Sequence, residues 1–221
     1  MVVAVAVVLW YRSKARPEWW APPNPQDPHI AEVADRVEYQ LVEQAQLVRP
    51  MEDEWGVRVH ESQINAWLAS RLPKWLAHHD LREWNEAVRL VQVHVEDGAL
   101  TIGAQISGGL QPRVVSVRLV PTLEDGRLAV VADSVSVGRI SIGTAPIDRA
   151  VEELRDAVTS EVLNDPAVVD IIETLRGERT WPAEFTLADG RLVEVFELTL
   201  ERGAISARCR TKSQNGETLK R

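Results

Sequence analysis

The pattern of hydrophobic positions begins with helical spacing. Over residues 29–48, apolar side chains recur at intervals of three and four, which is typical of an amphipathic helix. Asp27-Pro28 is a good start signal for this helix, since proline fits the first turn. Pro50 is predicted to close it, and residues 55–60 form a short extended piece.

A second amphipathic helix is predicted directly after this piece. Ser62 is a plausible N-cap, and the competing frame places His60 at the cap with Gln63 reaching back from the third position. Pro73 should end or kink the helix, because proline cannot continue the backbone hydrogen bonding of a helix interior. Residues 74–79 then add about one further turn.

From residue 88 onward the period of the pattern changes to two, which indicates strands. Asp97-Gly98 is a strong hairpin turn, and short turns between neighbouring strands predict an antiparallel meander. Further helices are expected over residues 146–162 and 167–175. The alternating segments are residues 91–95, 100–106, 115–119, 128–132, 135–142, 185–187, 192–200 and 204–210. The predicted fold is therefore α+β: a twisted antiparallel sheet of hairpins packed against amphipathic helices, in a single domain over residues 29–212.

An uncharged apolar run opens the chain and ends at a basic cluster. As a helix, residues 2–11 would be about 16 Å long, whereas a bilayer core is about 30 Å thick. Three interpretations remain open: a signal anchor whose true start lies upstream, a signal peptide without its basic region, or a buried N-terminal strand. We favour the anchor, a transmembrane or signal-anchor segment over residues 1–16 of a single-pass membrane protein. The residues expected at the membrane interface are Trp10, Tyr11, Arg12, Lys14, Arg16, Trp19 and Trp20.

Residues 17–28 hold five prolines and are predicted to form an extended, semi-rigid stalk. Trp19 and Trp20 would either lie at the level of the lipid headgroups or pack back onto the domain. The last segment, residues 213–221, is polar and is expected to be a frayed tail.

Composition narrows the function classes. The chain has 221 residues, is 45% hydrophobic and 26% charged, and can therefore bury a core. Its net charge of -8 argues against a nucleic-acid partner, because nucleic-acid binding depends on a cationic surface. The single cysteine, Cys209, excludes an intrachain disulfide and is predicted to be an inert core thiol.

The sequence carries no catalytic motif and no cofactor fingerprint. His79 and Glu83 share a helix face, but no third ligand follows from their spacing, so we predict a solvated helix end and no metal site. We expect a protein without enzymatic activity. A hydrolase of unfamiliar geometry would need a histidine and a carboxylate in contact within a concave pocket.

Residues 61–69 (ESQINAWLA) resemble a motif in uncharacterised signal-anchored bacterial proteins, in which an extended piece leads into a helix beginning roughly Ser/Thr-Glu-x-x-Leu-Asn-x-x-Leu. The YpmS-like family is similar in this respect, as are mycobacterial lipid-binding proteins of the LmeA type. The likeness covers the anchor, this motif and the order of helices before hairpins. It implies an extracytoplasmic α+β domain whose curved sheet wraps a helix, with a lipid-holding groove and no catalytic residues.

The expected function is a membrane-tethered binding module at the outer face of a cell membrane, holding a lipid or acyl chain. The candidate groove pairs one helix face with facing strands, unless those side chains close on each other as a core. The candidate lining is Trp67, Leu68, Leu72, Trp75, Val93, Leu100 and Ile102. The alternative is a structural or assembly subunit of a bacterial envelope complex, with the apolar stripe of residues 29–48 exposed to a protein partner.

Overall fold

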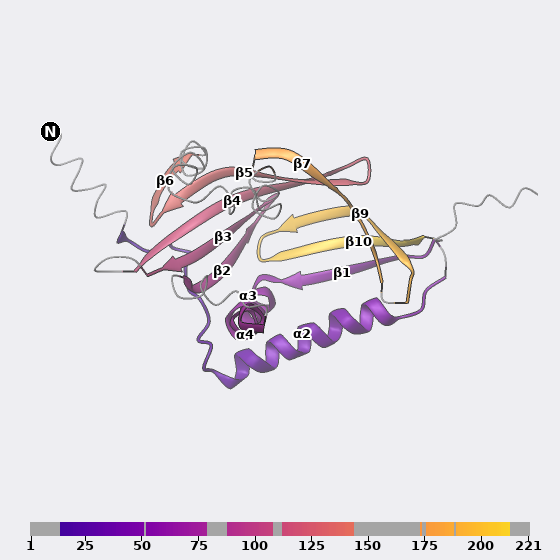
Figure 1. Cartoon of the computed structure of the whole chain (residues 1–221), viewed down its shortest axis with the longest axis horizontal. Helices are drawn as coiled ribbons and strands as arrows, with labels where there is room; N and C mark the ends of the chain where they lie inside the picture. The colour runs from indigo at the N-terminus through magenta and orange to yellow at the C-terminus, as the bar shows by residue number, and fades with distance from the viewer. Residues whose placement is uncertain are drawn as a thin grey trace, which may run out of the picture.

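The computed structural model describes residues 14–50, 52–78, 88–107, 112–143, 173, 176–187 and 189–212 (Figure 1). It is an α+β structure, mostly antiparallel sheet with a few helices. Within the described residues, the elements in chain order are α2 (Pro28–Gln46), β1 (Glu54–His60), α3 (Glu61–Ser70), α4 (Leu72–His78), β2 (Val88–Glu96), β3 (Ala99–Ile106), β4 (Arg113–Glu124), β5 (Arg127–Val137), β6 (Ile140–Gly143), β7 (Arg176–Pro182), β8 (Glu184–Thr186), β9 (Leu192–Glu201) and β10 (Ala204–Lys212).

The strands form two antiparallel sheets, where the sequence predicted one. A four-stranded sheet has the order β1-β10-β9-β8, and a six-stranded sheet has the order β2-β3-β4-β5-β6, with β7 paired to β5 (Figure 1). The division arises because β1 pairs with β10, from the far end of the chain, while α3 and α4 separate β1 from β2. Periodicity finds strands but does not report such long-range pairing.

Helix α3 covers the outer edge of β2. The side chain of Asn65 accepts a hydrogen bond from the Val93 N–H at 2.7 Å and donates to the Val93 carbonyl at 2.8 Å. Glu61 accepts from the Val95 N–H at 2.7 Å. An exposed strand edge offers unpaired backbone groups to other chains. Asn65 therefore substitutes for a neighbouring strand, which gives the asparagine of the family-like motif a structural role.

Two hairpin turns join the sheets to each other. In the β2–β3 turn, Asp97 accepts a hydrogen bond from the Arg202 N–H, and Gly98 donates to the Leu200 carbonyl. In the β9–β10 turn, Gly203 donates to the carbonyl of Val95. Gly98 has a φ of 75°, a conformation that the tight turn requires and that glycine adopts without strain. The Asp97-Gly98 turn predicted from the sequence is thus confirmed and also holds the sheets together.

Helix α2 begins as predicted and ends slightly earlier. Asp27 is the N-cap and accepts from the His29 N–H, with Pro28 in the first turn. The helix stops at Gln46, before Pro50. At its C-terminal end, Arg191 donates to the carbonyls of Ala45 and Leu47, which have no partner within the helix.

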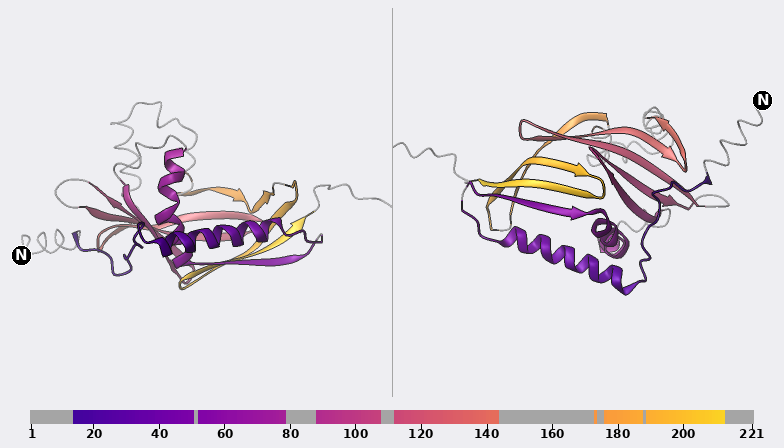
Figure 2. Two further views of the ribbon diagram at one scale, coloured as in Figure 1. Left: turned by 90° about the horizontal axis from the view of Figure 1, so that it is seen from below. Right: turned by 180° about the vertical axis from the view of Figure 1, so that it is seen from behind.

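The second predicted helix is two helices. Its cap is His60 and not Ser62, because the Gln63 side chain accepts a hydrogen bond from the His60 N–H at 2.8 Å. α3 ends at Ser70, and Pro73 lies in the first turn of α4, where its missing N–H is tolerated. Figure 2 shows α3 and α4 following one another and crossing α2.

The core lies where α3 meets both sheets. Val93, Val95 and Leu200 are buried there, and the partly buried side chains packed around them are Ile64, Leu68, Leu100, Leu198 and Ile205. Among the residues that the structure describes, no helix combines the length and apolar character that a membrane crossing requires. Most of the expected anchor, the expected helices over residues 146–162 and 167–175, and the tail lie outside the described residues.

Candidate functional site

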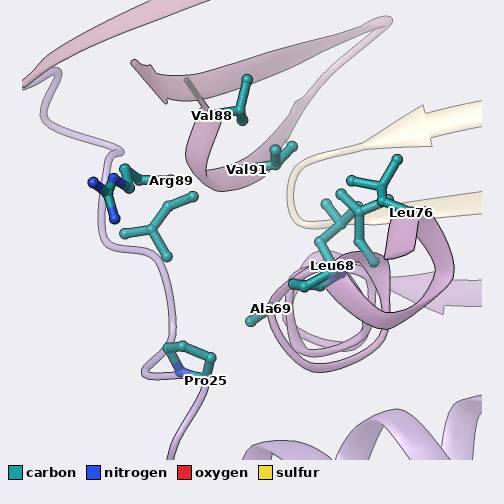
Figure 3. A pocket seen from close by; sticks show the side chains of 10 residues that line it. Pro25, Leu68, Ala69, Leu76, Val88, Arg89 and Val91 are labelled. Carbon is teal, nitrogen blue, oxygen red and sulfur yellow. The ribbon is translucent and has the colours of Figure 1, made fainter. Parts of the chain in front are cut away.

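Two of the seven candidate lining residues border a small, mostly apolar pocket that is partly open to solvent. Leu68 on α3 and Leu72 on α4 lie along a cavity of about 70 Å³ between these helices and β2 (Figure 3). We call this space the α4 cavity. Its full lining is Pro25, Leu68, Ala69, Leu72, Pro73, Leu76, Val88, Arg89, Leu90 and Val91.

The other five candidates do not share this cavity. Val93 and Leu100 belong to the core, and the Trp67 indole N–H donates to Glu38 on α2 at 2.6 Å. Trp75 is 49% exposed and Ile102 is 39% exposed. Ile102 pairs with Val93 and shares its face, but α3 packs on β2 and leaves this β3 position open to solvent. The residues predicted to line one groove therefore lie in three different places: the core, the interface between helices, and the surface.

Several cavity residues were missed. Ala69 and Leu76 follow from helical spacing, since they lie three residues before and four residues after Leu72, and that signal was available. Pro25 carried no such signal, because it reaches the cavity through the folding of the preceding segment onto the sheet. Ala21 and Trp19 both bond to Gln92 on β2, through the Ala21 N–H at 2.9 Å and the Trp19 carbonyl at 3.1 Å.

The chemistry of the α4 cavity is apolar with one cation at its rim. Arg89 is one of the lining residues, and its guanidinium points away from Leu68 and Leu76 (Figure 3). Its guanidinium donates to Ser107 at 2.8 Å, and no carboxylate of the described residues forms an ion pair with it. The cavity volume corresponds to about two water molecules at roughly 30 Å³ each. The arrangement suits an apolar group whose end carries a negative charge.

The described residues hold one contact that resembles a catalytic pair, between His94 and Glu61. His94 Nδ1 lies 3.2 Å from a Glu61 carboxylate oxygen. The same oxygen accepts the Val95 N–H, and the His94 ring is stacked against Trp19 with centroids 5.6 Å apart. Neither side chain borders the α4 cavity. We interpret the pair as part of the α3–β2 junction.

The described residues offer no metal site and no reactive thiol. They contain no group of three or more His, Cys, Asp or Glu side chains placed to hold a metal ion. His79 and Glu83, considered above as ligands, lie outside the described residues. Cys209 is 3% exposed, and burial raises the pKa of its thiol, which makes it a poor nucleophile.

The residues expected at a membrane interface are described in part. Trp10, Tyr11 and Arg12 lie outside the described residues. Of the two interpretations of the Trp19-Trp20 pair, the structure has the packed one: Trp20 is 6% exposed, and the two indoles meet edge to face with centroids 5.6 Å apart. The backbone carbonyl of Arg16 accepts a hydrogen bond from Arg139, and Lys14 is half-buried.

Comparisons with protein-family models, with curated proteins and with solved structures find no match to this chain. The resemblance of residues 61–69 to signal-anchored lipid-binding proteins therefore stays a prediction.

Proposed function

We propose that this chain is a membrane-tethered, non-enzymatic binding module that holds one acyl chain of a lipid at the α4 cavity. Its folded domain lies at the outer face of the cell membrane. The observation that carries the proposal is the α4 cavity itself, in which apolar side chains converge beside Arg89. An ionised carboxylate or phosphate at the end of an acyl chain pairs with a guanidinium.

The acyl chain enters by widening the cavity. At about 70 Å³ the space admits only the tip of a chain, so a longer segment requires α4 to move away from β2. α4 has seven residues, and Leu76 is its one buried side chain among those described. Burying apolar surface contributes about 25 cal/mol per Å², so the exchange is favourable when the ligand buries more apolar area than Leu76 gives up.

Filling the cavity tests the proposal. In Ala69→Leu the larger side chain occupies the space next to Leu72, and we expect binding of a fluorescent fatty acid to weaken about tenfold, or about 1.4 kcal/mol. Ala77→Leu adds the same atoms to an exposed position of α4 and should leave binding unchanged. The measurement is a fluorescence titration of the full chain, with palmitate as competitor.

Solvent extraction of the purified full chain, followed by mass spectrometry, provides a second readout. Co-purified lipid that is depleted in Ala69→Leu and retained in Ala77→Leu supports an acyl-binding site at this cavity. No extracted lipid together with no saturable fatty-acid binding overturns the proposal.

The tether is tested separately from the ligand. If residues 1–16 anchor the chain, the full chain stays with membranes after a carbonate wash, and a chain beginning at Pro17 is released. Release of both forms contradicts the anchor, while leaving acyl binding to be decided by the titration above.

A second candidate function is an assembly subunit of an envelope complex, favoured by the exposed C-terminal half of α2. The N-terminal half packs through Ala34 and Val37, whereas Val42 is 50% exposed. Apolar surface that remains exposed on a folded domain is typical of a protein contact. A photo-crosslinker at Val42 should give one discrete protein adduct in cells, and a crosslinker at the exposed Glu32 should give none. Identical results at both positions would contradict this candidate.

A further inference from the structure

A second concave site lies on the face of the six-stranded sheet opposite α3. It has a volume of about 420 Å³, six times that of the α4 cavity, and is open to solvent. The residues that line it come from the segment before α2, which forms one wall, and from strands β2 to β5, the turn after β5 and β6, which form the floor. We call it the hydroxyl groove. Its lining is Pro17, Glu18, Trp19, Glu96, Thr101, Ser116, Arg118, Ser134, Ser136, Gly138, Arg139 and Ser141.

Strand register aligns the groove residues in two rows. The first row runs Gln92, Gly103, Ser116, Ser136 and Ser141 across five strands, and the second row runs His94, Thr101, Arg118 and Ser134. Side chains alternate between faces along a strand. The opposite face of the same sheet carries Val93, Ile102, Val117 and Val135. The groove floor thus combines the hydroxyls of Thr101, Ser116, Ser134, Ser136 and Ser141 with Arg118, which lies between Thr101 and Ser134 in the second row; Gln92, Gly103 and His94 continue the rows beyond the groove lining.

The aromatic wall of the groove is held in place. A Cβ atom at Gly103 would lie 2.5 Å from the Trp19 ring and 2.8 Å from the Trp20 ring, so the absence of a side chain there lets the indoles approach the strand. Gln92, 4% exposed, bonds to the backbone of Trp19 and Ala21. The indole of Trp19 is therefore fixed at the rim before a ligand binds, which lowers the entropy cost of binding.

The charges of the groove compensate one another. Arg139 lies 3.4 Å from Glu18, and Arg118 lies 3.4 Å from Glu96 and 2.8 Å from Asp133. The hydrogen bond to Asp133 raises the pKa of Arg118, which keeps this guanidinium charged and engaged. Among the described lining residues, the charges of two arginines and two glutamates balance, and Asp133 beside Arg118 adds one further carboxylate. A strongly anionic or cationic ligand would have to break these pairs.

The hydroxyl residues, in contrast, lack such ion pairs, and they differ in exposure: Ser134 and Ser136 are half-buried and Ser141 is exposed, whereas Thr101 and Ser116 are only 8% and 5% exposed. Within the described part of the chain, the side chains of Thr101, Ser116, Ser134, Ser136 and Ser141 form no side-chain hydrogen bond with another described residue. A hydroxyl both donates and accepts. Such a set of hydroxyls matches a ligand that itself carries alternating donors and acceptors and no charge.

We propose that the hydroxyl groove binds a neutral carbohydrate, with sugar hydroxyls on the serine and threonine rows and Trp19 at the rim. A sugar ring combines hydroxyl edges with an apolar C–H face, and the indole offers an apolar surface for that face. The groove is open to solvent, which leaves room for one segment of a longer glycan. This site is independent of the α4 cavity, because it lies on the other face of the sheet.

The test uses the full chain and an array of uncharged oligosaccharides based on glucose, mannose, galactose and N-acetylglucosamine, together with sulfated and phosphorylated counterparts, followed by calorimetry on the best binder. The double variant Thr101→Val with Ser136→Ala removes two hydroxyls of the floor and is expected to weaken binding about tenfold, or about 1.4 kcal/mol. Thr199→Val makes the matched change on β9 of the other sheet and should bind as the wild type does. Circular dichroism and thermal melting of each variant establish that it is folded.

Three results overturn the inference: no uncharged glycan binds at millimolar concentration, a bound glycan is equally well held by the folded double variant, or only sulfated or phosphorylated glycans bind. The result is separable from the acyl proposal, because Ala69→Leu leaves glycan binding unchanged if the groove is the site. Single-residue Ser136→Ala provides a milder second variant, which should show a smaller loss of affinity than the double variant.

Discussion

The outer faces of the two sheets differ in how their polar side chains are satisfied. On the four-stranded sheet, cations and carboxylates alternate and pair across strands: Arg208 lies 2.8 Å from Glu54 and 3.0 Å from Glu197, and Arg58 lies 2.7 Å from Glu201. On the six-stranded sheet, the groove floor carries hydroxyls that lack such partners among the described residues. Both faces look polar by composition, but they leave different amounts of hydrogen-bonding capacity for a ligand.

The polar groups that have no partner within the protein indicate which polar surface can bind a ligand. The charged face is a network in which Arg210 and Lys212 also have acidic partners, at 2.6 Å from Glu54 and 2.9 Å from Glu194. Such networks stabilise the fold a little and keep the surface soluble. The hydroxyl groove stabilises little and is concave, which is the combination expected of a binding surface.

The largest expected effect is a loss of stability, and it should differ between two strand glycines, one on each sheet. Gly103→Val places a side chain within 3 Å of Trp19 and Trp20, and we expect a loss of about 1–3 kcal/mol in the free energy of unfolding from overpacking. Gly56→Val on β1 meets its nearest heavy atom, the Ala207 oxygen, at an ordinary 3.6 Å and should cost much less. Urea denaturation of both variants provides the measurement, and equal losses would contradict the close approach of the indoles.

The next largest effect is a salt-dependent loss of stability on the charged face of the four-stranded sheet. Arg208→Ala removes the guanidinium shared by Glu54 and Glu197, and we expect a loss of about 0.2–1 kcal/mol for each exposed pair. The loss should shrink as salt rises, because ions screen exposed charges. Denaturation at low and high sodium chloride tests this, with Ser136→Ala as a control that should show no salt dependence. A loss independent of salt would indicate lost packing on Phe196, whose ring centroid lies 5.0 Å from the Arg208 guanidinium.

A smaller effect depends on pH. The hydrogen bond from Arg210 holds the pKa of Glu54 below its ordinary value of 4.5. A carboxylate with a depressed pKa in the folded state adds stability at neutral pH, and this is lost as the pH falls through that folded pKa. The difference in unfolding free energy between wild type and Glu54→Gln should therefore be present at neutral pH and disappear in acid. A constant difference from neutral to acid pH would show that the charge of Glu54 is not its cause.

The smallest effect is expected at the groove floor. Ser136→Ala deletes a hydroxyl that has no partner among the described side chains, and the free energy of unfolding should change by less than about 0.5 kcal/mol. Thermal melting measures it. A loss well above this value would mean that the groove hydroxyls contribute to the fold and would weaken the distinction between the two faces.

Much of the local structure could be predicted from the sequence. Alternation gave most strands of the meander, and the Asp97-Gly98 turn and the Asp27-Pro28 helix start follow from local backbone chemistry. The single strand predicted over residues 135–142 is wrong, because a turn at Gly138-Arg139 divides it between β5 and β6, and β7 was not predicted. The division into two sheets could not be predicted, because the pairing of β1 with β10 joins segments far apart in the chain. The helix cap at His60 is the less favoured frame in the sequence, since histidine is a poor cap by propensity.

The sites were less predictable than the elements. Helical spacing placed Leu68 and Leu72 correctly at a cavity, but it could not tell that Val93 and Leu100 close into a core. The alternation of Ser134 and Ser136 with apolar neighbours was a visible signal for the hydroxyl groove. The position of Trp19 at this groove could not be predicted from the sequence. It depends on Gln92 and on the absence of a side chain at Gly103, and both residues are far from Trp19 in the chain.

The attachment of the early prolines to the sheet has a mechanical consequence. Force applied along the chain from its N-terminal side would reach the sheet through residues 16–21, which bond to Arg139 and Gln92, before it reached α2. A membrane anchor joined to this segment would hold the domain at a short distance and restrict its rotation. The mouth of the hydroxyl groove would then face a fixed direction, close to whatever surface the protein is fastened to.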